Sequence, residues 1–251
     1  MSERSATSRW IRALDVSSSV VTTLARFGAG ARVGATGPRP ERTLELWDFE
    51  GCPYCRKARE ALSILDLDAL VYPCPKKGRR YRPGLVERGG KAQFPYLADP
   101  NTSREMYESD LIVRYLFETY GDGSVPLALA GGPLTDLSSM LGGLLRPGLG
   151  TWYRPARAPE QPLELYSYEA SPFSRIVREE LACLELPYLL HNVARGSSKR
   201  EAFVQRSGRM MVPYLIDPNT GREIFESALI VHYLRETYAL PKKLDRVDQL
   251  A

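Results

Sequence analysis

Two cysteines separated by two residues form the motif with the clearest chemistry in this chain. The motif Cys52-Pro53-Tyr54-Cys55 follows a segment of strand character, 43–49, and opens a segment of helical character that begins at Pro53. A thiol at a helix N-terminus faces unpaired N–H groups and the positive end of the helix dipole, which favour the nucleophilic thiolate. Cys55 lies within the first turn and can resolve a mixed disulfide. The spacing predicts a redox dithiol with Cys52 as the attacking group.

Zinc binding is the other chemistry that this spacing allows. A structural zinc ion needs four ligands, usually two cysteine pairs or one pair with histidines at set spacing. The chain has 4 Cys and 2 His, and both histidines, His191 and His232, lie far from the motif. The sequence therefore favours a redox motif and predicts no metal site. Cys74 and Cys183 have no partner nearby in the sequence, and we expect both to be small buried apolar side chains.

An internal duplication positions the motif within a larger unit. Residues 95–120 match residues 213–238 at 19 of 26 positions without a gap. Upstream, the dithiol motif aligns with Ser171-Pro172-Phe173-Ser174. A period of about 119 residues is far longer than that of a solenoid, so it indicates a duplicated domain. A weaker match between 19–30 and 139–150 extends the repeat upstream and predicts a short helix near 9–33 that packs on its own domain or on the other one.

Each unit reads as strand, helix, strand, helix, strand, strand and helix. This order predicts an α/β fold in which two tandem βαβαββα domains each have a mixed four-stranded sheet flanked by helices. We expect the domains at 43–121 and 162–240. A Gly/Pro-rich linker with a short helix is expected at 122–161, and an N-terminal extension with a short helix at 1–42.

The composition limits the class of protein. Hydrophobic residues make up 43% and charged residues 25% of the 251 residues, and the net charge of +4 is too small to indicate nucleic-acid binding. No apolar run is long enough for a membrane span. So few cysteines fit a reducing compartment, and we expect a cytoplasmic protein. Because the first 42 residues are rich in Arg and Ser, organelle targeting stays open.

Two further motifs recur in both units. Phe94-Pro95 and Val212-Pro213 each open a predicted strand. They are candidates for a site-forming cis peptide bond, with an ordinary trans proline as the alternative. Glu108-Ser109 and Glu226-Ser227 each open a predicted helix, whose N–H groups can bind an anion. Simple capping of the helix by the serine is the alternative.

In combination, these motifs resemble those of glutathione transferase N-terminal domains, and the Cys-Pro-Tyr-Cys motif resembles that of glutaredoxins. The resemblance covers about residues 43–121 and 162–239 and implies a thioredoxin-like fold with glutathione as cosubstrate. It implies that Cys52 is the nucleophile, that Cys55 resolves, and that the Phe94 backbone pairs with the cysteinyl part of glutathione. Glu108 and Ser109 would hold the γ-glutamyl end. The other positions that it implies for glutathione binding are Tyr54, Lys91, Pro95, Ser171, Val212, Pro213, Glu226 and Ser227.

The chain departs from the glutathione transferase pattern in two ways. The segment 122–161 is too short and too rich in Gly and Pro to be the all-helical domain that supplies the electrophile pocket. The second unit also has Ser171 and Ser174 in place of the cysteines, and serine cannot exchange disulfides. Ser171 either stabilises a glutathione thiolate or caps the helix that Pro172 opens.

The expected function is therefore that of a glutathione-dependent thiol–disulfide oxidoreductase, acting on disulfides or glutathionylated substrates. Two alternatives stay open. One is a non-catalytic protein that binds glutathione or serves as a scaffold. The other is a protein that holds an iron–sulfur cluster between two protomers through Cys52 and glutathione. The sequence predicts no nucleic-acid partner and leaves a homodimer open.

Overall fold

The computed structural model describes residues 17, 19, 28–130 and 148–241. Of the short helix expected near 9–33, Ser17 and Ser19 are helical, residues 28–33 are not, and the rest lies outside the described residues. Residues 131–147 of the linker, where the second short helix is expected, also lie outside the described residues. Among the described helices, none is long and apolar enough to cross a membrane.

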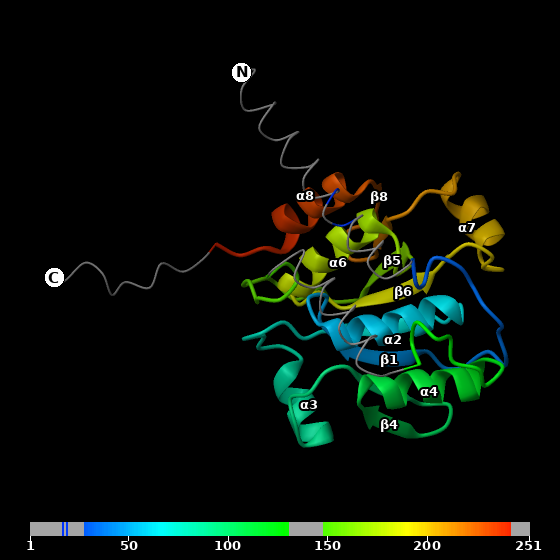
Figure 1. The fold of residues 1–251 in the computed structure, drawn as a ribbon. Coiled ribbons are helices and arrows are strands. Elements are labelled where there is room, and N and C mark those ends of the chain that lie inside the picture. The colour runs from blue at the N-terminus through cyan, green and yellow to red at the C-terminus, as the bar shows by residue number, and fades with distance from the viewer. Residues whose placement is uncertain (1–16, 18, 20–27, 131–147, 242–251) are drawn as a thin grey trace.

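The two units have the same order of elements (Figure 1). The first unit consists of β1 (Leu44–Asp48), α2 (Pro53–Ile64), β2 (Ala69–Pro73), α3 (Arg82–Gly89), β3 (Tyr96–Asp99), β4 (Arg104–Tyr107) and α4 (Ser109–Tyr120). The second unit consists of β5 (Leu163–Ser167), α6 (Pro172–Cys183), β6 (Tyr188–Asn192), α7 (Arg200–Ser207), β7 (Tyr214–Asp217), β8 (Arg222–Phe225) and α8 (Ser227–Tyr238). The predicted βαβαββα order is confirmed in both.

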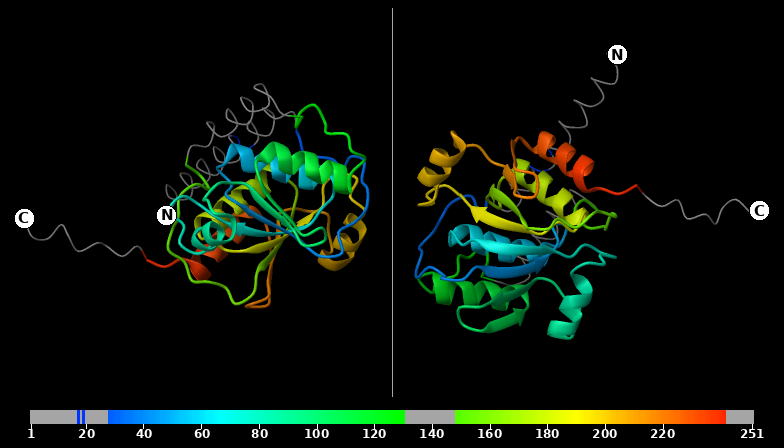
Figure 2. Two further views of the ribbon diagram at one scale, coloured as in Figure 1. Left: turned by 90° about the horizontal axis from the view of Figure 1, so that it is seen from below. Right: turned by 180° about the vertical axis from the view of Figure 1, so that it is seen from behind.

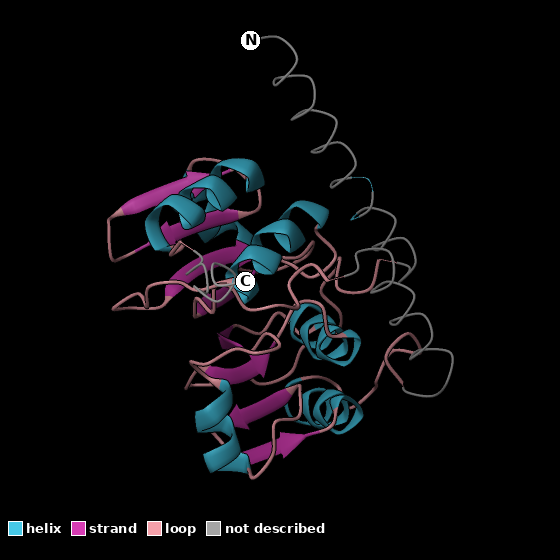
Figure 3. Ribbon diagram, turned by 90° about the vertical axis from the view of Figure 1, so that its left-hand side faces the viewer, coloured by secondary structure: helices cyan, strands magenta, loops and turns pink. Residues whose placement is uncertain are grey.

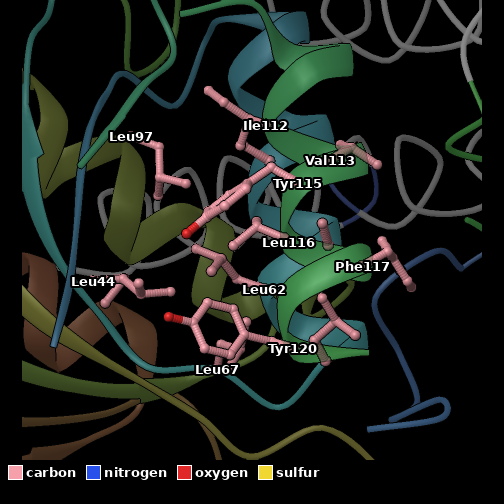
Figure 4. Close-up of a cluster of buried hydrophobic side chains, with 14 of the residues drawn as sticks. Leu44, Leu62, Leu67, Leu97, Ile112, Val113, Tyr115, Leu116, Phe117 and Tyr120 are labelled. Carbon is pink, nitrogen blue, oxygen red and sulfur yellow. The ribbon is translucent and has the colours of Figure 1, made fainter. Parts of the chain in front are cut away.

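Hydrophobic side chains of β1 point alternately to the two faces of the sheet, and helices cover both faces. Leu44 and Leu46 point into a core that α2 and α4 enclose, and Figure 4 shows Leu62, Leu116 and other side chains filling it. Trp47 points to the opposite face, where it belongs to a second cluster with Leu85 of α3. Successive strand residues face opposite sides, so this β1 pattern requires a layer on each face.

The two four-stranded sheets join into one eight-stranded sheet with the order β4-β3-β1-β2-β6-β5-β7-β8. In each half the first two strands are parallel and the remaining pairings are antiparallel, so each half has the mixed sheet that the sequence predicts. The halves meet where β2 pairs antiparallel with β6, and Leu70 pairs with Leu189, its own equivalent in the repeat. The units are therefore related by an approximate two-fold axis through this pair. Figures 2 and 3 show the joined sheet and the two units side by side.

The segment before each unit packs on the other unit. Val33 N donates to Arg195 O at 2.8 Å, and Tyr153 N donates to Lys76 O at 3.0 Å in the equivalent contact. Gly150 lies so close to the first unit that an added Cβ would stand 2.7 Å from Cβ of Glu50. With its φ of +64°, this position requires glycine on both steric and conformational grounds. Residues 28–33 thus contact the second unit at Arg195, although Gly30 also lies against Ser63 and Glu60 of the first unit.

A buried cluster of charges lies between the units. Arg59 of α2 is 3.0 Å from Glu169 of the second unit and 3.2 Å from Glu50 of its own unit. Arg178 of α6 is 2.9 Å from each of the same two carboxylates. Asp48 adds a further ion pair with Arg59. The side chains of the two arginines and the two glutamates are at most 3% exposed and that of Asp48 is 4% exposed, so each charge depends on its partners for stabilisation.

The charges shift one another's ionisation in opposite directions. Burial disfavours the ionised form of Glu50, but Arg178 and Arg59 outweigh it and lower the pKa of that carboxyl to about 2. For Asp48 burial prevails over Arg59, and the pKa rises to about 6. Glu50 and Glu169 occupy equivalent positions in the repeat, as do Arg59 and Arg178, so the cluster repeats the two-fold relation of the sheet.

We expect Arg59→Met to lower the free energy of unfolding by about 3–5 kcal/mol, because it leaves buried carboxylates without their counter-charge. Urea denaturation of the full chain measures the change. Arg206→Met is the matched control, since the Arg206–Glu223 pair is roughly half exposed and its loss should cost no more than about 1 kcal/mol.

Equal costs for the two variants would contradict a structural role for the cluster. If Arg59→Met does not fold, Arg59→Lys retains the charge without the planar fork, and it should unfold at a lower urea concentration than the natural protein.

Candidate functional site

The dithiol lies at the start of α2, as expected. Cys52 occupies the N-cap and Pro53 the first helical turn. The Cys55 N–H donates to Cys52 Sγ at 3.3 Å, so the sulfur itself caps the helix. Cys52 retains 5% of its surface and Cys55 none. Of the two sulfurs, only that of Cys52 belongs to a residue with any remaining contact with solvent.

The surroundings of the two thiols shift their pKa values in opposite directions. A hydrogen bond from the Cys55 side chain is the main factor that lowers the pKa of Cys52. The Cys55 N–H and the Arg59 guanidinium lower it further, against the opposing effect of burial. Burial, together with the charge of Cys52, raises the pKa of Cys55 well above the usual thiol value. The arrangement favours a thiolate at Cys52 and a thiol at Cys55.

The pairing of the strands brings the other predicted positions to the end of the sheet beside the dithiol, which we call the sheet edge. Trp47 pairs with Tyr96, and Tyr96 pairs with Tyr107, both antiparallel. The end of β1, the start of β3 and the end of β4 therefore meet beside the start of α2. The Phe94–Pro95 peptide bond at the start of β3 is cis.

Arg82, which the sequence did not single out, connects this edge. Its guanidinium lies 4.5 Å from the centroid of the Phe94 ring and 5.8 Å from that of Phe49. Its Nε donates to Pro75 O at 2.6 Å. Burial lowers the pKa of Arg82, while the cysteines of the dithiol are among the groups that favour its charge. The equivalent residue in the second unit is Arg200, since Arg82 opens α3 and Arg200 opens α7, so comparison of the two units gives no signal that singles out Arg82.

Glu108 and Ser109 depart from the expected helix cap. The N-cap residue of α4 is Glu108, which has a φ of 69°, and no side chain caps the helix. Capping by Ser109 is therefore wrong, because this serine is already the first helical residue and is buried. The Glu108 carboxylate is exposed and accepts from Gln93 Nε2, which joins it to the Phe94–Pro95 turn.

Two predicted contact residues lie at the rim. Tyr54 is 45% exposed. The Lys91 ammonium lies 4.6 Å from the centroid of the Tyr107 ring, and Tyr107 OH donates to Lys91 O at 2.9 Å. Lys91 is thus held close to Glu108, the residue that follows Tyr107.

The second unit repeats this edge without thiols. Ser171 caps α6 by accepting from Ser174 N at 3.2 Å, which confirms the capping interpretation, and Ser174 Oγ donates to Ser171 Oγ at 2.9 Å. Ser19 Oγ donates to Pro172 O at 2.9 Å, so the N-terminal segment reaches this turn. The remaining predicted positions sit as in the first unit, with a cis Val212–Pro213 bond and with Glu226, at a φ of 71°, preceding Ser227.

The other titratable residues serve the interface between the units or the surface. His191 lies between Asp68 of the first unit and Glu164 of its own, at 3.2 and 3.1 Å, so it helps to join the two units. His232 is exposed and pairs with Glu236. Cys74 is fully buried, as expected, whereas Cys183 is only partly buried. In the described part of the chain, no three His, Cys, Asp or Glu side chains gather as a metal site would require.

The loop 76–80 is only in part the solvated loop that its basic composition indicates. Lys76, Lys77 and Arg79 are exposed. Arg80, in contrast, donates to the backbone oxygens of Glu185 and Ala156, both in the second half of the chain. The loop therefore helps to join the units.

Comparison with known proteins gives similar sequences and structures. The chain is 33% identical over 84 residues to the glutathione S-transferase-like protein OpS6 of Beauveria bassiana, a match that covers 34% of this chain and 38% of the relative. The chain thus spans well under half the length of this relative.

Two solved structures are similar over part of their length. The Bombyx mori glutathione transferase BmGSTD1 matches with 22% identity and a TM-score of 0.30, over 34% of this chain and 38% of the other. The Leishmania trimeric glutathione transferase TDR1 matches with 14% identity and a TM-score of 0.28, over 80% of this chain and 68% of the other.

The family model described as "Glutathione S-transferase, N-terminal domain" matches twice, over residues 46–124 and 165–242. Each match begins within the first strand of a unit and ends just beyond its last helix. Together the matches cover more than half of the chain, which therefore belongs to the glutathione S-transferase N-terminal domain family.

Proposed function

We propose that this protein is a glutathione-dependent thiol–disulfide oxidoreductase with Cys52 as nucleophile and Cys55 as resolving thiol. The observation that carries the proposal is the cap of α2, where Cys52 Sγ accepts the Cys55 N–H at 3.3 Å and Arg59 adds positive charge. In thiol–disulfide exchange a thiolate is both the attacking and the leaving species. The N-cap position lowers the pKa of Cys52 and so favours its thiolate.

The reaction follows from the two acidities. The Cys52 thiolate attacks the glutathione sulfur of a mixed disulfide, a new bond forms between Cys52 and glutathione, and the substrate leaves as a thiolate that takes up a proton. The Cys55 thiol then loses its proton and attacks Cys52, which releases glutathione and leaves a Cys52–Cys55 disulfide. Alternatively, the thiolate of a second glutathione attacks the glutathione sulfur of the mixed disulfide, which forms glutathione disulfide, releases Cys52 as a thiolate and restores the dithiol.

The residues at the sheet edge fit a tripeptide with two carboxylates and one amino group. The N-terminus of α4 offers backbone N–H groups beside Ser109, and the exposed Glu108 carboxylate can bind the amino group of the γ-glutamyl end. Arg82 and Lys91 supply positive charge for the glycyl carboxylate. The backbone N–H and C=O of Phe94, before Pro95, are the proposed partners of the cysteinyl backbone of glutathione.

The second unit can at most bind glutathione, because it has no thiols for disulfide exchange. Its Ser171 and Ser174 hydroxyls hydrogen-bond to each other and cannot exchange disulfides. Val212, Pro213, Glu226 and Ser227 keep the edge geometry of the first unit, and a second glutathione site there is a proposal that calorimetry on a Cys52→Ser protein can count. One bound glutathione per chain would assign binding to a single unit.

We expect Cys52→Ser to abolish turnover of the mixed disulfide of glutathione and 2-mercaptoethanol in an assay coupled to glutathione reductase, because serine cannot form the intermediate. Ser171→Ala, the equivalent position in the second unit, should leave the rate unchanged. Turnover that survives Cys52→Ser would overturn the assignment of the nucleophile.

The pH dependence of Cys52 alkylation tests the role of its neighbour. Since the hydrogen bond from the Cys55 side chain is the main factor lowering the Cys52 pKa, Cys55→Ala should move the alkylation midpoint to higher pH. Cys55→Ser should move it less, because a serine hydroxyl can donate in the same place, as Ser174 does to Ser171. Iodoacetamide labelling followed by mass spectrometry gives the midpoints, and equal midpoints for the two variants would contradict the proposed hydrogen bond.

A further inference from the structure

An aromatic and basic surface lies beside the dithiol and has no part in the reaction proposed above. It consists of Trp152, Lys76 and Lys77, and we call it the Trp152 surface. Trp152 is 47% exposed, and the ammonium groups of Lys76 and Lys77 lie 5.5 and 5.7 Å from its ring centroid. Both lysines are exposed. The surface therefore combines a large apolar face with two positive charges.

The backbone ties this surface to the turn that holds Cys52. Gly51 N donates to Gly150 O at 3.4 Å, immediately before the nucleophile in sequence. An added Cβ on Gly51 would stand 2.0 Å from Thr151 Oγ1, so the two segments are in direct contact. Thr151 O in turn accepts from Lys76 N at 2.6 Å. A molecule that contacts Trp152 is therefore only a few residues from Cys52.

The second unit lacks this combination at the same place in its fold. Arg32 occupies the position of Trp152 and forms the same parallel bridge, with Arg195 in the position of Lys76. Gly196 stands where the first unit has Lys77. The backbone contact is thus preserved in both units, but the aromatic ring and the adjacent pair of lysines are found only beside the dithiol. The difference between the units at this place thus coincides with the presence of the dithiol.

The two lysines carry charge that the described part of the chain does not neutralise. In residues 28–130 and 148–241, the contacts of the Lys76 and Lys77 ammonium groups are those with the Trp152 ring, and neither group pairs with a carboxylate. Two adjacent like charges repel each other, and an anionic partner would relieve that repulsion while it covers the exposed ring.

We propose that the Trp152 surface docks an acidic segment of a protein substrate and thereby brings that substrate's disulfide to Cys52. The inference rests on the proposed function and names its substrate class. An acidic polypeptide fits because carboxylates complement Lys76 and Lys77, and apolar or aromatic side chains pack on Trp152. Attraction of opposite charges raises the rate of encounter, and salt screens it.

The experiment uses three synthetic peptides that each carry one cysteine as a glutathione mixed disulfide, flanked by Glu, Gln or Lys residues. We expect kcat/KM at low salt to be about tenfold higher for the Glu peptide than for the Lys peptide, and the ratio to shrink as salt increases. Lys76→Gln with Lys77→Gln should remove the preference. Arg32→Gln with Arg195→Gln removes two positive charges at the equivalent place in the second unit and should preserve it.

Trp152→Ala should lower kcat/KM for the peptides but leave turnover of the mixed disulfide of glutathione and 2-mercaptoethanol unchanged. Equal rates for the three peptides, or equal effects of the two double variants, would overturn the inference. If the natural protein does not turn over the small mixed disulfide, the proposed function is refuted instead.

In that case fluorescence anisotropy tests docking alone, with labelled peptides that carry Ser in place of Cys. Tighter binding of the Glu peptide than of the Gln and Lys peptides supports the inference, and equal affinities overturn it.

Discussion

The ion cluster of Arg59, Arg178, Glu50 and Glu169 is the constraint on which the rest of the structure depends. None of these charges can be buried alone, because an unpaired ion in the interior costs several kcal/mol after relaxation. Each arginine bridges a carboxylate of its own unit and one of the other, so neither unit completes its interior without its partner. The continuous sheet and the exchanged segments follow the same two-fold relation and add apolar and backbone contacts around it.

The cluster also links the architecture to the chemistry. Glu50 lies two residues before Cys52, and Arg59 lies on the helix that Cys52 caps. The guanidinium that satisfies the buried carboxylates is therefore the same group that favours the Cys52 thiolate. Asp48, with a pKa near 6, places a further buried carboxyl on this network and raises the pKa of Cys55. The difference in acidity between the two thiols thus draws on groups that also hold the units together.

The order of elements, the N-caps at Cys52 and Ser171 and the sheet of each half were predictable from local sequence signals. These depend on the alternation along strands, on proline at the first helical turn and on the repeat itself. The joining of β2 to β6 was not predictable, because an exposed strand edge carries no mark of its partner. Arg59 on α2 and Glu50 in the turn before it were overlooked since charged residues usually face solvent, although their recurrence as Arg178 and Glu169 carried the signal. The alternative that Ser109 caps its helix could not be dismissed from the sequence, because the positive φ that makes Glu108 the N-cap residue is invisible there.

The pairing of Leu70 with its own equivalent, Leu189, has a consequence for how such a protein can change. An interface of this kind is the isologous contact of a symmetric dimer, here closed within one polypeptide. In a dimer of identical subunits every substitution appears twice, so both sites must stay alike. When the two copies are joined in one polypeptide, each can change independently of the other. The exceptions are positions where both copies are needed at once, such as the arginines and glutamates of the cluster. One half could then exchange its cysteines for serines and its tryptophan position for arginine while the shared interior stayed intact.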